Sequence, residues 1–314
     1  MPNKDLLVVG ELNVDLILNK IEGFPKIGTE IIAENMNVTL GSSSAIMAAN
    51  ASAIGINTSF CGIVGKDDFG DFIRKELQKK QVNTDFIEKT TKHQSGVTVV
   101  MNYNQDRANV TYCGAMEALT IDKIPWNHLD NFKHFHLSNF FIQKGIRKDI
   151  VSIFEKAKSY GVTTSLDLQW DPENKWDFNY KECLPHVDVF MPNEAELLAL
   201  TKTTTVNNGI EEIMPYANTI VIKMGDKGSM AFHNGETYQA LPYANPNYVD
   251  SIGAGDSFNA GFIKKYIEKQ PIETCLKFGN LTGALNTTAA GGTTAFSGKK
   301  NIIEDAIKLF NAEI

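Results

Sequence analysis

Short apolar runs alternate with longer amphipathic stretches along most of the chain, and this rhythm sets the predicted fold. The run Leu6–Val9 ends at Gly10 and predicts a buried strand. Five further apolar runs predict strands, at 60–64, 135–138, 163–168, 187–191 and 219–223. Apolar residues at helical spacing predict helices at 45–54, 71–81, 147–160, 194–200, 209–217, 256–269, 273–289 and after 301. Strands that alternate with helices indicate an α/β fold of three layers, α/β/α, with a mostly parallel central sheet.

Two segments interrupt this alternation because they carry strand-like patterns without crossover helices. One is 13–40, and the other is 97–113, in which two apolar runs flank the polar turn 104–107 and predict a hairpin. We expect the two segments to form a small β-sheet lid over the carboxyl ends of the main strands. The main domain would then comprise 1–12, 41–96 and 114–314.

Charge and cysteine content exclude several classes of function. The chain has 314 residues, a net charge of −7 and no run of Lys or Arg longer than a pair, so nucleic-acid binding is not expected. Four widely spaced cysteines predict reduced thiols rather than a disulfide framework or a zinc site. The N-terminal segment does not read as a signal sequence, and no apolar run is long enough to span a membrane. We therefore expect a cytoplasmic protein with no membrane partner.

The most informative segment begins at Asp250 and reads DSIGAGDSFNA. It places Gly253, Gly255 and Asp256 where extended chain gives way to a predicted helix. Glycines can adopt conformations that direct several backbone N–H groups to one point, and a helix N-terminus adds unpaired donors and partial positive charge. Asp256 beside such an anion hole could accept a proton from an alcohol. The segment therefore indicates phosphoryl transfer to an alcohol.

Four further motifs accompany this segment. They are GELNVD from Gly10, GSSSAIMAAN from Gly41, MPNEAE from Met191 and KMGDKG from Lys223. The five motifs occur in the order found in the ribokinase-like (PfkB-type) family of carbohydrate kinases, which the chain resembles over nearly its whole length. The last motif resembles the family signature DTxGAGD, with Ser251 in place of threonine.

The resemblance implies a kinase that transfers phosphate from ATP to a hydroxyl, expected to be primary, of a sugar or sugar-like molecule. Asp256 would be the general base, and the backbone of Gly253, Ala254 and Gly255 would form the anion hole. The residues implied at the nucleotide are Asn193, Lys223, Gly225, Gly228 and Asn280. Those implied at the acceptor are Asn13, Asp15, Gly41 and Ser43.

The resemblance also implies ATP and Mg²⁺ as cofactors and a dimer as an assembly. Glu196 would help to position Mg²⁺, partly through water. Many family members bind a monovalent cation such as K⁺, for which Asp250, the carbonyl of Ile252 and the loop 287–295 would be the candidates. That loop departs from the commoner family pattern at Gly291-Gly292-Thr-Thr. Lid sheets often pair in this family, and the Ile/Val content of 31–38 is compatible with a homodimer.

Several of these residues also have a purely structural interpretation. Asp256 could cap its helix, and Asn193 with Glu196 could form a capping box. Asn13 and Asp15 could be turn residues, and Lys223 could simply end a strand.

Four further side chains and a histidine pair lie outside the motifs. Trp170, Trp176, Asp167 and Gln169 would either line the sugar pocket or, for the aromatics, pack in the core. His134 and His136 have the i,i+2 spacing of metal ligands, but no third ligand suggests itself, which favours surface or packing roles.

Two positions in the motif from Gly41 change the expected acceptor. Ribokinases carry a lysine and an asparagine where this chain has Ser43 and Ile46. Ile46 cannot form a hydrogen bond with a hydroxyl, and Ser43 has no positive charge. The segments 29–40 and 97–113 contain one basic residue, Arg107, so a phosphorylated sugar lacks an obvious clamp. We therefore expect a neutral sugar or sugar-like alcohol.

Three other functions are weighed against a sugar kinase. A nucleoside kinase on the same scaffold could stack its base on Phe140, Phe141 or Trp170. A sugar- or nucleotide-binding protein without catalysis is disfavoured by the intact Gly-Ala-Gly-Asp run. A dinucleotide oxidoreductase is disfavoured because the glycine pattern lacks its third glycine and lies late in the chain. The sequence also contains no Walker-type phosphate loop.

Overall fold

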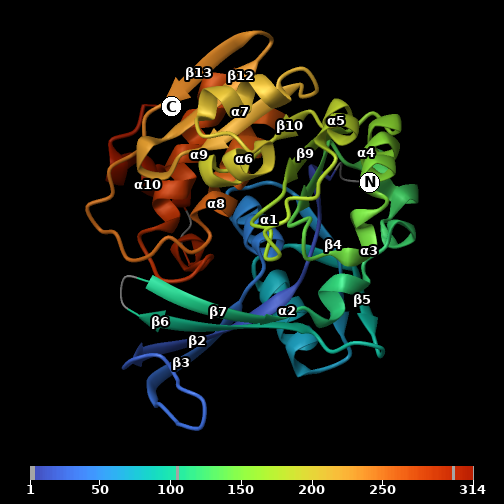
Figure 1. Cartoon of the computed structure of the whole chain (residues 1–314). Coiled ribbons are helices and arrows are strands. Elements are labelled where there is room, and N and C mark those ends of the chain that lie inside the picture. Colours follow the sequence, from blue (N-terminus) through green and yellow to red (C-terminus); the bar gives the residue numbers. More distant parts are fainter. Residues whose placement is uncertain (1–3, 104–105, 299–300, 314) are drawn as a thin grey trace.

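A nine-stranded sheet forms the centre of the molecule in the computed structural model, which describes residues 4–103, 106–298 and 301–313 (Figure 1). The strand order is β13-β12-β11-β10-β9-β8-β1-β4-β5. The seven strands from β11 to β5 in this order pair in parallel with their neighbours. The two strands at the other end, β12 and β13, pair antiparallel. The strands are β1 (Leu6–Val9), β4 (Thr58–Gly65), β5 (Asn83–Thr90), β8 (His134–Ser138), β9 (Thr163–Asp167), β10 (Val189–Phe190), β11 (Thr219–Lys223), β12 (Ser229–His233) and β13 (Glu236–Ala240).

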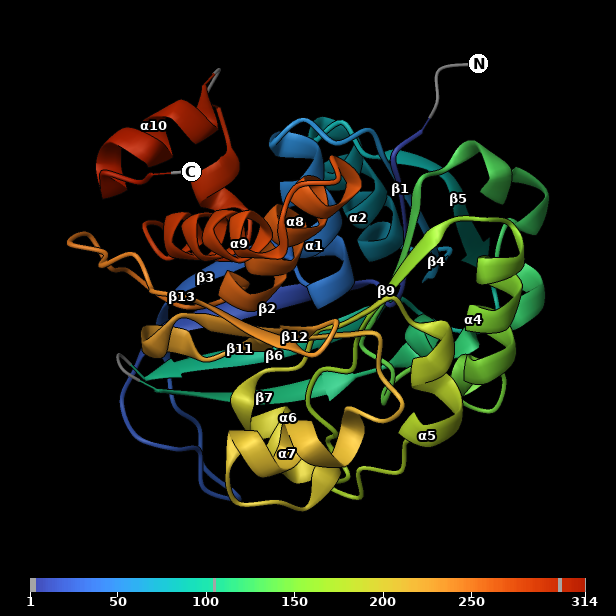
Figure 2. The same ribbon diagram turned by 90° about the horizontal axis from the view of Figure 1, so that it is seen from above.

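Helices cover both faces of this sheet (Figure 2). One layer contains α1 (Ser43–Ala53), α2 (Asp68–Lys79), α8 (Ala254–Ile267), α9 (Ile272–Asn286) and α10 (Ile302–Phe310). The other contains α4 (Ile150–Ser159), α5 (Tyr180–Cys183), α6 (Glu194–Thr201) and α7 (Val206–Ile213), with the short α3 (Lys144–Arg147) nearby. The predicted three-layer α/β/α fold with a mostly parallel sheet is confirmed. In the described part of the chain, no helix combines the length and apolar character needed to cross a membrane.

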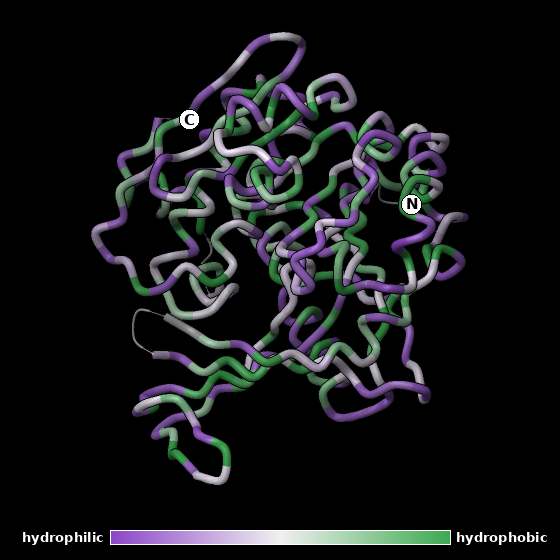
Figure 3. The backbone as a smooth tube through the Cα atoms, viewed as in Figure 1, coloured by the Kyte–Doolittle hydropathy of each residue, from purple (hydrophilic) through white to green (hydrophobic). Residues whose placement is uncertain are grey.

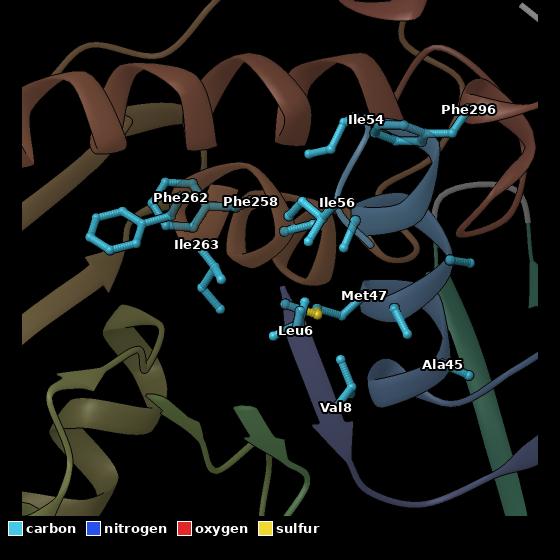
Figure 4. Packing of buried hydrophobic residues seen from close by; sticks show 14 of the residues in the cluster. Leu6, Val8, Ala45, Met47, Ile54, Ile56, Phe258, Phe262, Ile263 and Phe296 are labelled. Carbon is cyan, nitrogen blue, oxygen red and sulfur yellow. The ribbon is translucent and has the colours of Figure 1, made fainter. Parts of the chain in front are cut away.

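The alternation of side chains along β1 explains how one strand supports two cores. Leu6 and Val8 belong to the core beneath α1 and α8, whereas Leu7 and Val9 belong to the core on the opposite face. Figure 4 shows the first of these cores, where Leu6 lies beside Met47 of α1. All of these side chains are at most 1% exposed. The double burial anchors the strand that leads into the site.

A separate four-stranded sheet projects from the main body (Figure 1). Its order is β3-β2-β6-β7, and its strands are β2 (Asn13–Ile21), β3 (Ala33–Leu40), β6 (Gly96–Tyr103) and β7 (Asp106–Tyr112). The predicted small sheet is thereby confirmed, while the domain boundaries and the lid function stay predictions. The hairpin turn at 104–105 and the side chain of Arg107 lie outside the described residues.

The register of this small sheet separates a polar face from an apolar face. Residues paired across neighbouring strands share a face. One row joins Thr39, Asp15, Thr98 and Thr111. The next row on that face has Ile17 and Val100 at its centre and ends in Asn37 and Asn109. The alternate rows are apolar, as in Val38, Leu16, Val99 and Val110 and in Met36, Leu18, Met101 and Ala108.

Three local predictions differ from the structure. Strand β5 was not predicted, because it is an edge strand with charged residues at three of its eight positions and lacks an apolar run. The helix predicted at 147–160 is divided into α3 and α4. The helix predicted at 209–217 begins earlier, at Val206, because the Thr205 side chain accepts a hydrogen bond from the Asn208 backbone and caps it.

Candidate active site

The carboxyl edge of the parallel sheet gathers polar residues from five strands. Glu11 and Asn139 follow β1 and β8, Asp167 ends β9, Asn193 follows β10 and Lys223 ends β11. These strands are consecutive neighbours in the sheet, in the order β11-β10-β9-β8-β1. Because parallel strands end at the same edge, their terminal side chains converge there.

One cavity of about 630 Å³ lies between this edge and the small sheet. Asn13, Asp15 and Ser43, three of the four predicted acceptor residues, line it. Asn13 Nδ2 donates to Asp15 Oδ1 at 2.9 Å and to Thr98 Oγ1 at 3.0 Å. The fourth, Gly41, lies directly behind them, because an added Cβ would come within 2.3 Å of Asp15 Oδ1. Only glycine fits this approach, so Gly41 shapes the cavity from behind.

Glu11 is a cavity residue that the sequence analysis missed. It is 1% exposed, yet its carboxyl group lines the cavity. It accepts hydrogen bonds from Ser43 Oγ at 2.9 Å, from Ser44 N at 3.3 Å and from the Ser44 hydroxyl. Burial raises the pKa of Glu11 above its ordinary value, although these hydrogen bonds oppose the shift. The sequence did contain a signal for Glu11, because a carboxylate that follows a fully buried strand by only two residues is expected near the sheet edge.

A second cavity, of about 560 Å³, lies on the other side of the 251–255 turn. Four of the five predicted nucleotide residues line it, together with the turn residues Ala254 and Gly255; these four are Lys223, Gly225, Gly228 and Asn280. The amide of Asn280 is itself engaged, since it donates to the carbonyls of Ala240 at 3.0 Å and Leu241 at 2.9 Å.

Asn193 and Glu196 form a complete capping box at the start of α6. Asn193 N donates to Glu196 Oε2, and Glu196 N donates to Asn193 Oδ1, both at 2.8 Å. The capping box that the sequence offered as a structural interpretation of Asn193 and Glu196 is therefore formed. The pair also lies beside the nucleotide cavity, because the backbone of Asn193 bridges to that of Lys223.

The turn at the start of α8 uses its two glycines differently. Gly253 has a φ of 76°, and an added Cβ would lie 2.8 Å from Gly292 Cα and 2.9 Å from Ile46 Cγ2. Gly255 has no left-handed φ, and its added Cβ would meet nothing closer than Lys223 Cδ at 3.8 Å. The expectation of unusual backbone geometry thus holds for Gly253 and is wrong for Gly255. The N–H of Ala254 donates to Ser251 O at 3.2 Å, so it is engaged within the turn.

Two buried asparagines hold the loop against which Gly253 packs. Asn50 Nδ2 and Asn286 Nδ2 both donate to the carbonyl of Gly292, at 2.8 and 2.6 Å. Asn50 Nδ2 also donates to Ser257 Oγ at 2.8 Å, and Ser257 Oγ donates to Gly253 O at 2.7 Å. This network connects α1, α8 and α9 at the turn, and no motif indicated it.

Asp256 is 7% exposed and faces an unusual concentration of buried charge. Asp167 Oδ2 pairs with Lys223 Nζ at 2.5 Å and also accepts from Asn259 Nδ2 at 2.5 Å. Burial raises the pKa of Asp256 well above its usual value; the charge of Asp167 adds to this effect, and Lys223 opposes it. Burial likewise raises the pKa of Glu196, to about 7. Burial alone would lower the pKa of Lys223, but Asp167 and Glu196 outweigh it and raise that pKa.

No group of three His, Cys, Asp or Glu side chains in the described residues has the spacing of a metal site. Glu196 is nevertheless 3% exposed, with Oε2 occupied by the helix cap. One carboxylate without a cage fits an ion that keeps most of its water and is held mainly by phosphates, as Mg²⁺ is. Asp250 is occupied by the backbone, because its carboxyl oxygens accept from Ile252 N and Gly291 N, both at 2.9 Å.

Aromatic residues divide clearly between core and cavity. Phe140, Phe141 and Trp176 are buried and pack together, so the first two are wrongly placed to stack on a ligand. Trp170 is 54% exposed and lines the first cavity.

The histidine pair belongs to the core. His134 and His136 are fully buried and share hydrogen bonds of 2.7 Å with Ser165 Oγ. Burial lowers the pKa of both to about 3, so they are neutral. Of the two roles expected from the sequence, surface or packing, the structure shows packing.

Comparisons with known proteins agree on one family. A family profile described as pfkB family carbohydrate kinase matches residues 3–298. Ribokinase from Bacillus subtilis (strain 168) is 25% identical over 288 residues, covering 92% of this chain and 94% of that protein. An ATP-dependent ribose-1-phosphate kinase from Halopiger xanaduensis is 26% identical over 299 residues, also covering 92% and 94%. The structure of Arabidopsis thaliana ribokinase complexed with ribose and ATP has a TM-score of 0.83 at 25% identity and covers 96% of this chain and 98% of that one.

The two glycines of the turn should respond oppositely to alanine. Gly253→Ala forces a side chain into a left-handed conformation and against Gly292, so we expect a loss of roughly 2 kcal/mol or more in the free energy of unfolding. Gly255→Ala adds a methyl group in open space to a helix and should unfold at or above the wild-type denaturant concentration. Urea unfolding of both variants tests this, and equal midpoints would contradict the assigned strain.

Proposed function

Because the chain belongs to the pfkB family of carbohydrate kinases and is a sugar-kinase phosphotransferase, we propose that it phosphorylates a hydroxyl of a neutral sugar or sugar-like molecule with ATP. Asp256 is the proposed general base. The observation that carries the proposal is the turn 251–255, which has a polar cavity on one side and the cavity with the predicted nucleotide residues on the other.

The chemistry follows from this placement. The acceptor hydroxyl transfers its proton to Asp256 while its oxygen attacks the γ-phosphorus, and ADP leaves. The backbone N–H groups of Gly253 and Gly255 are the proposed anion hole, with Ala254 supporting the turn. The raised pKa of Asp256 suits a base that must accept a proton near neutral pH.

ATP with Mg²⁺ is the proposed cofactor set. Mg²⁺ neutralises charge on the transferring phosphate when it is bound. Glu196 and Asn193 are the chain's proposed contacts to its water shell, and Lys223 the proposed contact to phosphate. Asp250 and the carbonyl of Ile252 remain the proposed site of a monovalent cation, because a carboxyl oxygen that accepts a backbone hydrogen bond keeps a further lone pair. The four cysteines are free thiols, which supports the proposal of a reducing compartment, the cytoplasm.

Asp256→Asn should remove the base and leave the cavities intact. We expect phosphate transfer to fall by about 10²–10⁴-fold, with ATP binding retained. Coupled ADP release measures the first quantity and calorimetry the second. Asp130→Asn, an exposed carboxylate remote from the site, is the matched control. Near-full turnover in Asp256→Asn would remove the residue from this role.

The same variant should also stabilise the fold. A carboxyl group whose pKa is raised by folding keeps its proton to higher pH in the folded state than in the unfolded state. The free energy of unfolding therefore falls as pH rises through that window and stays lower above it. Asp256→Asn escapes this loss, so at neutral pH it should unfold a few degrees above the wild type in calorimetry.

The charge of the first cavity defines the proposed acceptor class. Its described lining includes the carboxyl groups of Glu11 and Asp15 and the amides of Asn13, Asn109 and Asn139, and it includes no Lys or Arg. Amides and carboxylates form hydrogen bonds with hydroxyl groups, whereas buried carboxylates repel a phosphate ester. A neutral polyol fits this lining. Trp170 at the cavity wall also accommodates a flat substituent, which keeps nucleosides as the second candidate.

A screen of acceptors in matched pairs tests this class. Ribose against ribose 1-phosphate and fructose against fructose 6-phosphate should each favour the free sugar by at least about tenfold in kcat/KM, since one unfavourable charge contact costs more than 1.4 kcal/mol. Adenosine and inosine complete the screen. Preference for either phosphate ester would contradict the neutral-acceptor proposal.

A homodimer through the small sheet is the proposed assembly. The apolar face of that sheet exposes Met36, Val38, Val110 and Tyr112, at 62%, 38%, 63% and 52%. Figure 3 shows that hydrophobic positions continue into the projecting loop between β2 and β3, where Phe24, Ile27 and Ile32 are exposed. Apolar patches of this kind mark interaction sites, and a second copy would offer the same apolar surface.

Met36→Asp should disrupt this assembly. A buried charge in an apolar interface costs several kcal/mol, so we expect a shift from dimer to monomer in sedimentation equilibrium at micromolar concentration. Asn37→Asp adds the same charge one residue away, on the polar face of the sheet, and should leave the dimer intact. A monomeric wild-type protein would contradict the proposal.

A further inference from the structure

Gln169 lies between two carboxyl groups at the centre of the site and has no part in the function proposed above. It lies two residues after the end of β9 and has a φ of 60°. A long side chain in this left-handed region costs about 1–3 kcal/mol, and such strain persists only where surrounding contacts impose it. The contacts of the Gln169 side chain show what imposes it here.

The amide nitrogen of Gln169 makes two hydrogen bonds of equal length. Nε2 donates to Asp167 Oδ2 at 3.1 Å and to Asp256 Oδ1 at 3.1 Å. Carboxyl oxygens accept, and the amide nitrogen carries two hydrogens, so one hydrogen serves each acid. The backbone N–H of Gln169 adds a third contact, to Asp167 Oδ1 at 3.3 Å.

Asp167 is a fixed anchor for this bridge. Its side chain is 0% exposed, and Lys223 Nζ and Asn259 Nδ2 both contact its Oδ2 at 2.5 Å. Gln169 therefore joins Asp256 to an ion pair that the ends of β9 and β11 hold in place. Gln169 also lines the acceptor cavity, so the bridge lies on the side from which the acceptor would approach.

We propose that Gln169 is a positioning residue for the general base: its amide ties Asp256 Oδ1 to the Lys223–Asp167 pair, so that Asp256 Oδ2 receives the acceptor's proton. The inference rests on the proposed role of Asp256. In that step the acceptor O–H bond breaks, the proton moves to Asp256 Oδ2, the oxygen bonds to the γ-phosphorus, and the bond to ADP breaks. Gln169 stays neutral and keeps both hydrogen bonds.

The charges around Asp256 make this role dependent on pH. Asp167 at the end of β9, Glu11 after β1 and Glu196 in α6 disfavour the charged form of Asp256, and Lys223 at the end of β11 favours it. The Gln169 amide also favours the charged form, because it donates to the carboxylate. Without the amide, Asp256 would lose its proton only at higher pH.

Two variants separate the amide from the backbone. Gln169→Met keeps the length of the side chain and removes both donors, whereas Gln169→Gly removes the amide and also relieves the strain of the left-handed backbone. In both we expect the acidic limb of kcat/KM for the acceptor to move up by about one pH unit, because a hydrogen bond to a charged group is lost. Activity below the limb should fall about tenfold and recover at high pH, with the KM for ATP unchanged.

The control and the contrary outcomes are equally specific. Gln78→Met removes an amide that donates to Thr84 Oγ1 at 2.9 Å, far from the site, and should leave the pH profile unchanged. An unmoved acidic limb in both Gln169 variants, including a loss of activity that is the same at every pH, overturns the positioning role. Asp256→Asn distinguishes the positioning role of Gln169 from the general-base role of Asp256, because an active Asp256→Asn variant would contradict the general-base proposal itself.

Discussion

The buried ion pair between Lys223 and Asp167 is the interaction on which the rest of the site depends. Three buried carboxyl groups, those of Asp167, Glu196 and Asp256, act on this ammonium group, and a fourth, that of Glu11, acts on Asp256. Removing one partner of such a pair typically costs about 3–5 kcal/mol, because the other charge stays buried and unpaired. The pair is a consequence of topology: β9 and β11 flank β10, so their terminal residues meet across the short strand between them.

The same arrangement of buried charges lowers the stability of the fold and raises the basicity of Asp256. Buried acids in excess of the positive charge that can balance them destabilise a fold, so stability alone would favour fewer acids around Lys223. This site holds more: burial raises the pKa of Asp256 and brings that of Glu196 to about 7, and the neighbouring charge of Asp167 adds to both shifts. The raised pKa lowers the free energy of unfolding at neutral pH, and under the proposed mechanism it makes the carboxylate of Asp256 basic enough to accept a proton. The strained backbone of Gln169 belongs to the same compromise.

Sequence patterns predicted the parts of this structure that depend on local order. The buried strands, most of the helices and the glycine turn before Asp256 follow from apolar runs and from backbone chemistry, and the motifs identified the family. The Lys223–Asp167 pair could not be predicted, because 56 residues separate its partners and only the strand order brings them together. The same holds for Asn50, which reaches Gly292 across 242 residues. Edge strand β5 lacked an apolar run and so lacked a signal.

The position of Ile46 shows how the acceptor cavity and the turn are linked. From sequence, this residue indicated only the loss of a hydrogen bond to the acceptor. In the structure it is 4% exposed, and its side chain fills the space beside Gly253 and Gly292. The residue thus supports the turn 251–255 by packing, and the Gly292 carbonyl beside it accepts hydrogen bonds from two asparagine amides. The polar groups that line the cavity nearby are instead the carboxyl group of Glu11 and the amide of Asn139, which follow β1 and β8. Under the proposed function the two positions therefore act separately: Ser43 leaves the cavity without a positive charge that would favour a charged acceptor, and Ile46 stabilises the turn by packing.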